Sequence, residues 1–231
     1  MAQHHVIIYL NALLDAQRYR NNYANGVARI MSARYGGKQA DWLIIQQNIF
    51  ADWASYHADL NYSGEDGMAD IREGQFRVTR ALFRLANIKE PSKAEITSLA
   101  QTLVSEAPRT GNNFDMPAQQ FLQTLTMSPA VNITVTAYFC EAQARAILTA
   151  SGHTGISVIG ADTFQHYEMD THYFRYLHQY LKPNSPDSQR IYLDTHADTL
   201  QHAQKAGFIT HRITPDTTPE NWLSAIKMHS A

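Results

Sequence analysis

The hydrophobic pattern of the chain changes twice along its length. Residues 6–10 form a short β-branched and aromatic run, which predicts a buried strand. From about residue 15 to residue 104, apolar residues recur at helical spacing, as in "DWLIIQQNIFADWASYHADL" and "REGQFRVTRALFRLANI". From about residue 111 onward, strand and helix patterns alternate. The chain therefore predicts an all-helical segment inserted between a first strand and an alternating α/β region.

The alternating region supplies the fold class. Its predicted strands are "VNITVTAYF", "GISVIGAD", "QRIYLD" and "FITHRIT", and its predicted helices are "MPAQQFLQTL", "CEAQARAILTASG", "DTHYFRYLHQYL" and "ADTLQHAQKAG". Alternation of this kind indicates βαβ crossovers and a mostly parallel sheet. Ser92 with Glu95 three residues later predicts a capping box at one of the inserted helices, and residues 63–67 predict a loop. Helices inserted after the first strand are expected to form a lid over the carboxyl ends of the strands, where such sheets bind ligands.

Composition narrows the class of protein. Hydrophobic residues make up 44% and charged residues 17% of 231, which indicates a globular chain. The net charge of −2 gives no basic surface for nucleic acid. The single cysteine, Cys140, excludes an internal disulfide and favours a reducing compartment. The sequence shows neither a signal-peptide pattern nor an apolar run long enough for a membrane span. We expect a cytoplasmic protein whose partner, a small molecule or another protein, the sequence does not identify.

Four stretches together resemble the motifs of the haloacid dehalogenase (HAD) superfamily of hydrolases. They are "VIIYLNALLDA", "NITVTAY", "GADTFQHYEMDTHYF" and "IYLDTHADTLQHAQKAGF", in the order of the four motifs of that family. The resemblance covers nearly the whole chain and implies a HAD-like Rossmannoid α/β core with a mostly parallel sheet. It implies that residues 1–14 and 105–231 form the core and that residues 15–104 form an inserted helical cap.

The resemblance also shows where catalytic residues are missing. In the family an aspartate at the end of the first strand attacks the substrate, and a second aspartate two residues later acts as acid and base. An ungapped alignment places Ile8 and Leu10 at these positions, and one deletion places Tyr9 and Asn11 there instead. Neither alignment supplies a carboxylate. The lysine of the third motif falls on Glu168, which replaces a cation by an anion.

The remaining motif residues allow two interpretations each. Thr136 ends a β-branched strand, so it is either an ordinary strand residue or the motif-two hydroxyl that holds a phosphoryl oxygen. Asp194 and Thr195 come before a helix, where either is a good N-cap. Alternatively, Asp194 and Asp198 are weak ligands of Mg²⁺, which prefers oxygen ligands.

Two further residues are candidates for chemistry of their own. Asp15, just beyond the first motif, is expected to cap a helix or make a hinge contact. Cys140 begins a helix, which favours a lower thiol pKa, but a buried and inert thiol is the preferred interpretation.

Two hypotheses for function follow. The first is a HAD-like hydrolase homologue without ordinary phosphatase or dehalogenase activity, acting as a binding or interaction module. The alternative is a Mg²⁺-dependent hydrolase of a small phosphorylated metabolite, in which Tyr9, Asp15 or a cap residue supplies the missing chemistry. The charge reversal at Glu168 argues against anionic ligands at the strand ends.

Overall fold

A computed structural model describes residues 4–62, 67–129, 131–181, 189–214 and 218 of the chain. Its centre is a five-stranded sheet in which every pair of neighbouring strands is parallel. The strands are β1 (His4–Tyr9), β2 (Val131–Ala137), β3 (Ser157–Gly160), β4 (Arg190–Asp194) and β5 (Ile209–Arg212), in the spatial order β3-β2-β1-β4-β5. The predicted α/β class and parallel sheet are confirmed.

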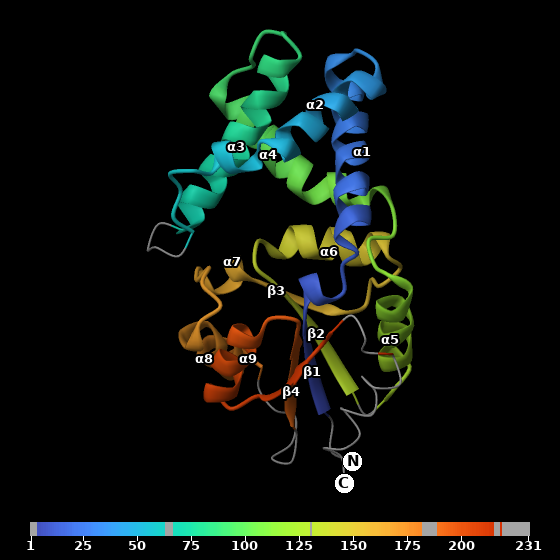
Figure 1. Cartoon of the computed structure of the whole chain (residues 1–231), viewed down its shortest axis with the longest axis vertical. Coiled ribbons are helices and arrows are strands. Elements are labelled where there is room, and N and C mark those ends of the chain that lie inside the picture. Colours follow the sequence, from blue (N-terminus) through green and yellow to red (C-terminus); the bar gives the residue numbers. More distant parts are fainter. Residues whose placement is uncertain (1–3, 63–66, 130, 182–188, 215–217, 219–231) are drawn as a thin grey trace.

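Helices fill every connection between strands (Figure 1). After β1 come the 3-10 turn η1 (Leu10–Ala12) and the helices α1 (Ala16–Tyr35), α2 (Gln39–Ala51), α3 (Gly67–Leu85) and α4 (Lys93–Glu106), with turns η2 (Trp53–Tyr56) and η3 (Ala107–Thr110). The chain then returns to the sheet through α5 (Met116–Thr126). The later connections contain α6 (Glu141–Ala150), α7 (Ala161–Phe164), α8 (Thr171–Tyr180) and α9 (Ala197–Lys205). No helix within the described ranges is long and apolar enough to cross a membrane.

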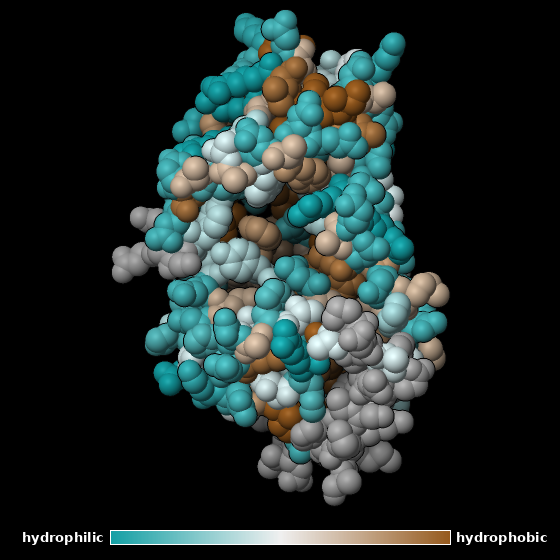
Figure 2. Space-filling model, viewed as in Figure 1, coloured by the Kyte–Doolittle hydropathy of each residue, from teal (hydrophilic) through white to brown (hydrophobic). Residues whose placement is uncertain are grey.

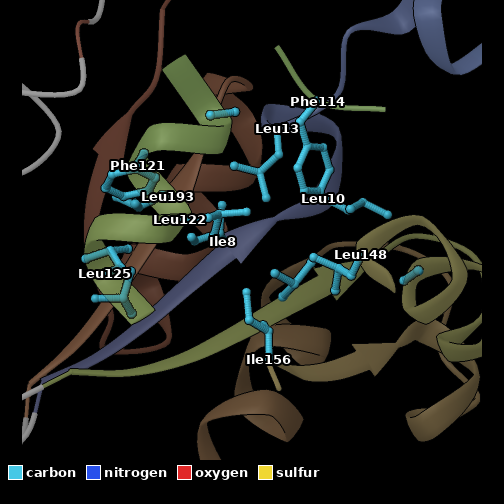
Figure 3. Close-up of a cluster of buried hydrophobic side chains, with 14 of the residues drawn as sticks. Ile8, Leu10, Leu13, Phe114, Phe121, Leu122, Leu125, Leu148, Ile156 and Leu193 are labelled. Atoms are coloured by element: carbon cyan, nitrogen blue, oxygen red, sulfur yellow. The ribbon is translucent and has the colours of Figure 1, made fainter. Parts of the chain in front are cut away.

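Two hydrophobic clusters cover the two faces of the sheet. Val6 and Ile8 of β1 point to one face and pack against α5 and α6, and Figure 3 shows Ile8 facing Phe121, Leu122 and Leu125 of α5. Ile7 and Tyr9 point to the other face, against α8 and α9. This alternation follows from the two-residue period of a strand, and it makes the sheet the middle of three layers.

The helices α1–α4 form a separate layer with a core of its own. Its buried side chains include Met31, Trp42, Ile49, Leu82 and Phe83. The predicted capping box is present at α4, where Ser92 accepts the N–H of Glu95 and the Glu95 carboxylate accepts the N–H of Ser92. The loop predicted at residues 63–67 lies outside the described residues except for Gly67, which begins α3. We call α1–α4 with η2 the helical layer; it stands over the carboxyl ends of the strands (Figure 1).

The segment that leaves β1 for the helical layer and the segment that returns toward α5 lie side by side. Asp15 donates its N–H to the carbonyl of Asn113 at 3.0 Å, and Leu14 forms an isolated antiparallel bridge with Phe114. The buried amide of Asn113 donates to the carbonyl of Pro108 and accepts from Asn22 of α1. Asp15 also caps α1 by accepting the N–H of Arg18 at 2.9 Å, as the sequence predicted. These bonds fix the start of the helical layer against its end.

Close backbone contact adds a second constraint at this junction. Gly26 in the middle of α1 lies against η3, and a Cβ there would overlap the carbonyl oxygen of Ala107 and lie 2.6 Å from the hydroxyl of Thr110. The close approach of η3 leaves no room for a side chain at residue 26, although in an open helical position alanine is more favourable than glycine by about 1 kcal/mol.

We expect Gly26→Ala to lower the free energy of unfolding by about 1–3 kcal/mol, because the overlap with η3 outweighs the gain in helix propensity. Urea denaturation measures the change. Arg29→Ala, at an exposed position three residues along the same helix, is the control and should change stability little. A Gly26→Ala protein more stable than the original chain would contradict the packing argument.

Candidate functional site

The candidate site lies where β1, β2 and β4 end. Tyr9 is paired with Thr136 of β2, and Ile8 is paired with Leu193 of β4, so that Asp194 follows beside Tyr9. Ile8 points to the opposite face, into the cluster under α5. The side chain that the structure places beside Asp194 is therefore the phenol of Tyr9. The order β3-β2-β1-β4-β5 puts the point where the strand order reverses between β1 and β4, which is where open α/β sheets bind ligands.

Tyr9 is a buried phenol in an anionic neighbourhood. Burial, and then the charge of Asp194 and the nearby Tyr138, raise the pKa of Tyr9 well above its ordinary value. Its hydroxyl accepts a hydrogen bond from the side-chain amide of Asn11 at 3.1 Å. At neutral pH this phenol stays protonated, so it is a poor nucleophile.

Asp194 is a fully buried carboxyl group whose hydrogen-bond partners among the described residues all contact the same oxygen. Its Oδ1 accepts the backbone N–H groups of Thr195 at 2.6 Å and His196 at 3.1 Å, and the Nδ1 of His196 lies 3.1 Å away. Its Oδ2 is buried without a partner among the described residues. The interpretation of Asp194 and Thr195 as helix caps is wrong: the N-cap residue of α9 is His196, with no side-chain cap bond. Asp194 instead orders the two residues that precede the helix.

The other predicted positions do not join Asp194 in a cluster of acids. Asp198 lies in the first turn of α9 and is exposed. Thr136 is buried beside the phenol of Tyr192, and neither hydroxyl has a hydrogen bond of good geometry among the described residues. Glu168 is exposed and lines a cavity of about 240 Å³ together with Tyr9, Tyr138, Tyr167, Met169, His196 and Thr199.

These positions give a poor donor set for magnesium. Within the described ranges there is no group of three histidine, cysteine or acidic residues that could hold a metal. Asp194 offers one free oxygen, whereas protein sites for Mg²⁺ usually combine one or two carboxylates with ordered waters or substrate phosphates. Cys140, at the N-cap of α6, has its thiol pKa raised chiefly by burial, which agrees with the inert interpretation.

A second and larger cavity lies between the helical layer and the sheet layer. Its volume is about 490 Å³, and Figure 2 shows the surface hollowed at this level, with apolar residues inside the hollow. The helical layer contributes most of its wall, and η1, Phe139 and Gln143 contribute the floor. This cavity was not predicted from the sequence, because its lining comes from many separate segments. The available signal was the spacing of Phe50, Trp53 and His57, which repeats every three to four residues.

Comparison with known proteins rests on structure alone. No family model matches the chain, and no curated protein matches it. Among solved structures, a defluorinating L-2-haloacid dehalogenase has a TM-score of 0.58 at 13% identity, over 93% of this chain and 82% of that chain. A HAD-hydrolase of Bacillus subtilis, solved with bound magnesium, has a TM-score of 0.58 at 14% identity, over 95% and 90%. A 2-haloacid dehalogenase of Pseudomonas syringae pv. Tomato has a TM-score of 0.54 at 16% identity, over the whole of both chains.

One prediction concerns the start of α8, where the third motif ends. Asp170 caps the helix by accepting the N–H of Tyr173 at 2.9 Å, and its carboxylate also contacts His166 and His172 at 2.9 and 3.2 Å. Burial acts to raise the pKa of Asp170, but these hydrogen bonds outweigh it and lower the pKa to about 2. A carboxyl group with a lowered folded-state pKa stabilises the fold above its unfolded pKa, and the stabilisation disappears as the pH falls toward 2.

We therefore expect Asp170→Asn, which keeps a capping oxygen, to lower the free energy of unfolding by about 1 kcal/mol near pH 5 and hardly at all near pH 2. Urea denaturation across this pH range measures the difference. Asp115→Asn is the control, because Asp115 caps α5 through the N–H of Ala118 and, within the described residues, has no hydrogen bond to a histidine. An equal decrease in the free energy of unfolding near pH 5 and near pH 2 would show that the charge of Asp170 does not stabilise the fold.

The chain has the fold of the HAD-like hydrolases, as its four resembling motifs implied.

Proposed function

We propose that this chain is a HAD-like hydrolase homologue that forms no covalent carboxylate intermediate and instead binds a small molecule between its helical and sheet layers. The observation that carries the proposal is the phenol of Tyr9 at the end of β1, beside the buried Asp194. A covalent route through that position needs a carboxylate, and the raised pKa of Tyr9 keeps the phenol from replacing it. In this proposal residues 15–104 serve as a cap whose inner surface holds the ligand.

The charges at the strand ends support the loss of phosphatase chemistry. The charge of Asp194 acts on Tyr9, and Glu168 lines the same small cavity as Tyr9. Within the described residues, the lining of this cavity includes no lysine or arginine. A phosphate dianion held there would meet like charges, each costing roughly 4 kcal/mol at 4 Å for an effective dielectric of 20. Phosphoryl transfer depends on neutralising the charge of the transferred group, so this surface opposes the reaction.

One observation favours the alternative, a magnesium-dependent hydrolase. The unpartnered Oδ2 of the buried Asp194 is an oxygen that a bound cation would satisfy. The rest of the donor set does not fit, since Asp198 is exposed in α9 and Asn11 donates its amide to Tyr9. The magnesium-dependent hydrolase is therefore the second candidate function.

The decisive experiment looks for the covalent intermediate and for turnover. The purified chain is incubated with L-2-chloropropionate, and separately with p-nitrophenyl phosphate and Mg²⁺, and is then examined by intact mass spectrometry and by chloride or phosphate release. We expect no mass increment and no turnover above the protein-free rate, for the original chain and for Tyr9→Phe alike. The removal of the carboxylate nucleophile typically lowers the rate of such enzymes by several orders of magnitude.

Three results would sink this proposal. Turnover lost in Tyr9→Phe would make the phenol the nucleophile. Turnover that survives Tyr9→Phe but is lost in Asp194→Asn or Asp15→Asn would place the chemistry on one of those carboxylates. A mass increment on the original chain would show the covalent intermediate directly. Thermal unfolding of each variant, measured alongside, separates a loss of chemistry from a loss of fold.

A further inference from the structure

The larger cavity has an aromatic wall. Ring contacts run in sequence from Tyr19 to Tyr23 at 6.0 Å, to Phe50 at 6.0 Å, to Trp53 at 5.9 Å and to His57 at 4.5 Å, where the last two rings are stacked. All five residues line the cavity. The ring chain passes from α1 across α2 into η2 and beyond, so several segments of the helical layer build one surface. Such surfaces favour flat, unsaturated ligands, because aromatic pairs gain energy beyond the area they bury.

The described residues that line the cavity carry a single formal charge. None of them is acidic, and Arg20 is the one arginine or lysine among them. His57 does not add a second charge at neutral pH, because burial and then the charge of Arg77 lower its pKa. Across the described part of the chain, Arg20 has no hydrogen bond or ion pair, unlike Arg77 and Arg80 of the helical layer, which are paired with acids. Arg29 and Arg34 of α1 also lack such a partner there, but Arg20 is the arginine of α1 that lines the cavity. An unpaired guanidinium in an aromatic cavity suits one anionic group on the ligand.

A buried amide provides a second polar contact. Gln46 of α2 is 1% exposed and lines the cavity, and its Nε2 has no partner among the described residues. A buried donor without a partner destabilises a protein, so an unpartnered amide beside a cavity points to a ligand oxygen as its acceptor. The Nδ1 of His57 is bonded to the hydroxyl of Tyr62, and its buried Nε2 also lacks a partner.

The two polar groups lie at different depths. A helix rises 1.5 Å per residue, so Arg20 of α1 lies about 22 Å along its helix from the connection between α1 and α2. Gln46 of α2 lies about 10 Å along its helix from the same connection. Arg20 is exposed, as are Trp53 at 42% and Phe139 at 41%, so this end forms the mouth. Gln46 lies farther in. A ligand that meets both groups has an acid at one end and an oxygen acceptor at the other.

We propose that this cavity binds an aromatic monocarboxylate that carries a hydroxyl or carbonyl oxygen at the end opposite its acid group. The carboxylate pairs with Arg20 at the mouth, the ring lies along the aromatic wall, and the far oxygen accepts from Gln46. The inference rests on the proposed function in one respect, that the cavity is a ligand site. It names the ligand class for that site.

Three naphthalene probes test the assignment on the full chain by isothermal titration calorimetry. They are 6-hydroxy-2-naphthoate, which has both polar groups, 2-naphthoate, which lacks the far oxygen, and 2-naphthol, which lacks the acid. We expect 6-hydroxy-2-naphthoate to bind with a Kd of roughly 10–100 µM and each of the other two to bind about five- to tenfold more weakly. 2-Naphthyl phosphate, a dianion, should not bind more tightly than 2-naphthoate.

Two variants assign the contacts separately. Arg20→Gln should weaken both naphthoates about tenfold and leave 2-naphthol unchanged, whereas Arg29→Gln, an exposed arginine on the same helix, should change none of them. Gln46→Leu should weaken the two hydroxyl probes about fivefold and leave 2-naphthoate unchanged. Gln46→Leu should also keep or raise the melting temperature of the ligand-free protein, because the substitution removes an unpartnered donor. The melting temperature shows that this variant folds.

Absence of binding by 6-hydroxy-2-naphthoate at millimolar concentration would overturn the ligand class, as would equal weakening of all three probes by Arg20→Gln. Tighter binding of 2-naphthyl phosphate would assign the cavity to phosphate-bearing ligands instead. These outcomes leave the absence of covalent turnover untouched, whereas turnover of chloropropionate or a phosphoester would sink the proposed function without changing the probe affinities. The two proposals therefore fail separately.

Discussion

The arrangement of the site depends on the parallel pairing of β1 with two neighbours at once. Because β1 is held in register by β2 and by β4, its last residue is placed between Thr136 and Asp194. A shift of one residue would exchange Tyr9 for Ile8 and turn every side chain of β1 to the other face. The buried clusters on the two faces make such a shift costly, since Val6 and Ile8 pack under α5 while Ile7 and Tyr9 pack under α8. The same packing that stabilises the sheet thus fixes a phenol at the strand end.

The consequences of that phenol are mainly electrostatic. Asp194 is buried, and one of its oxygens has no partner among the described residues. Burial is the main cause of the raised pKa of Tyr9, and the charge of Asp194 raises that pKa further. An anionic ligand near the strand ends would meet this carboxylate and Glu168. The larger cavity above has the opposite character, because the described residues that line it include Arg20 and no acid. Among the described residues, acidic side chains therefore lie at the strand ends and a cation lies in the lining of the larger cavity.

Much of the fold could be predicted from the sequence, because the period of the apolar residues differs between strands and helices. The β-branched runs became β1 to β5, and the capping signals at Ser92 and Asp15 mark helix starts in the structure. The end of β1 could not be decided in the same way. An alignment without a gap places Ile8 at the motif position, and an alignment with one deletion places Tyr9 there. The pairing of β1 with β4 in the structure decides between the two residues. The capping interpretation of Asp194 was wrong because the chain bends at Thr195 and α9 begins only after His196, which is its N-cap, and sequence pattern alone does not reveal that.

The larger cavity was beyond sequence reasoning for a further physical reason. Its wall exists only when the helical layer is held at a fixed place over the sheet, and that placement depends on contacts between residues about 100 positions apart, such as Asp15 with Asn113 and Leu14 with Phe114. The close contact of Gly26 with η3 acts at the same junction. Gln46 then becomes informative. Its amide is buried by the layer that these contacts position, and it lacks a partner among the described residues. An unpartnered buried donor lowers stability unless a ligand supplies the missing acceptor. The rigid junction and the unpartnered amide thus favour the same conclusion, a cavity built to hold a ligand away from the strand ends.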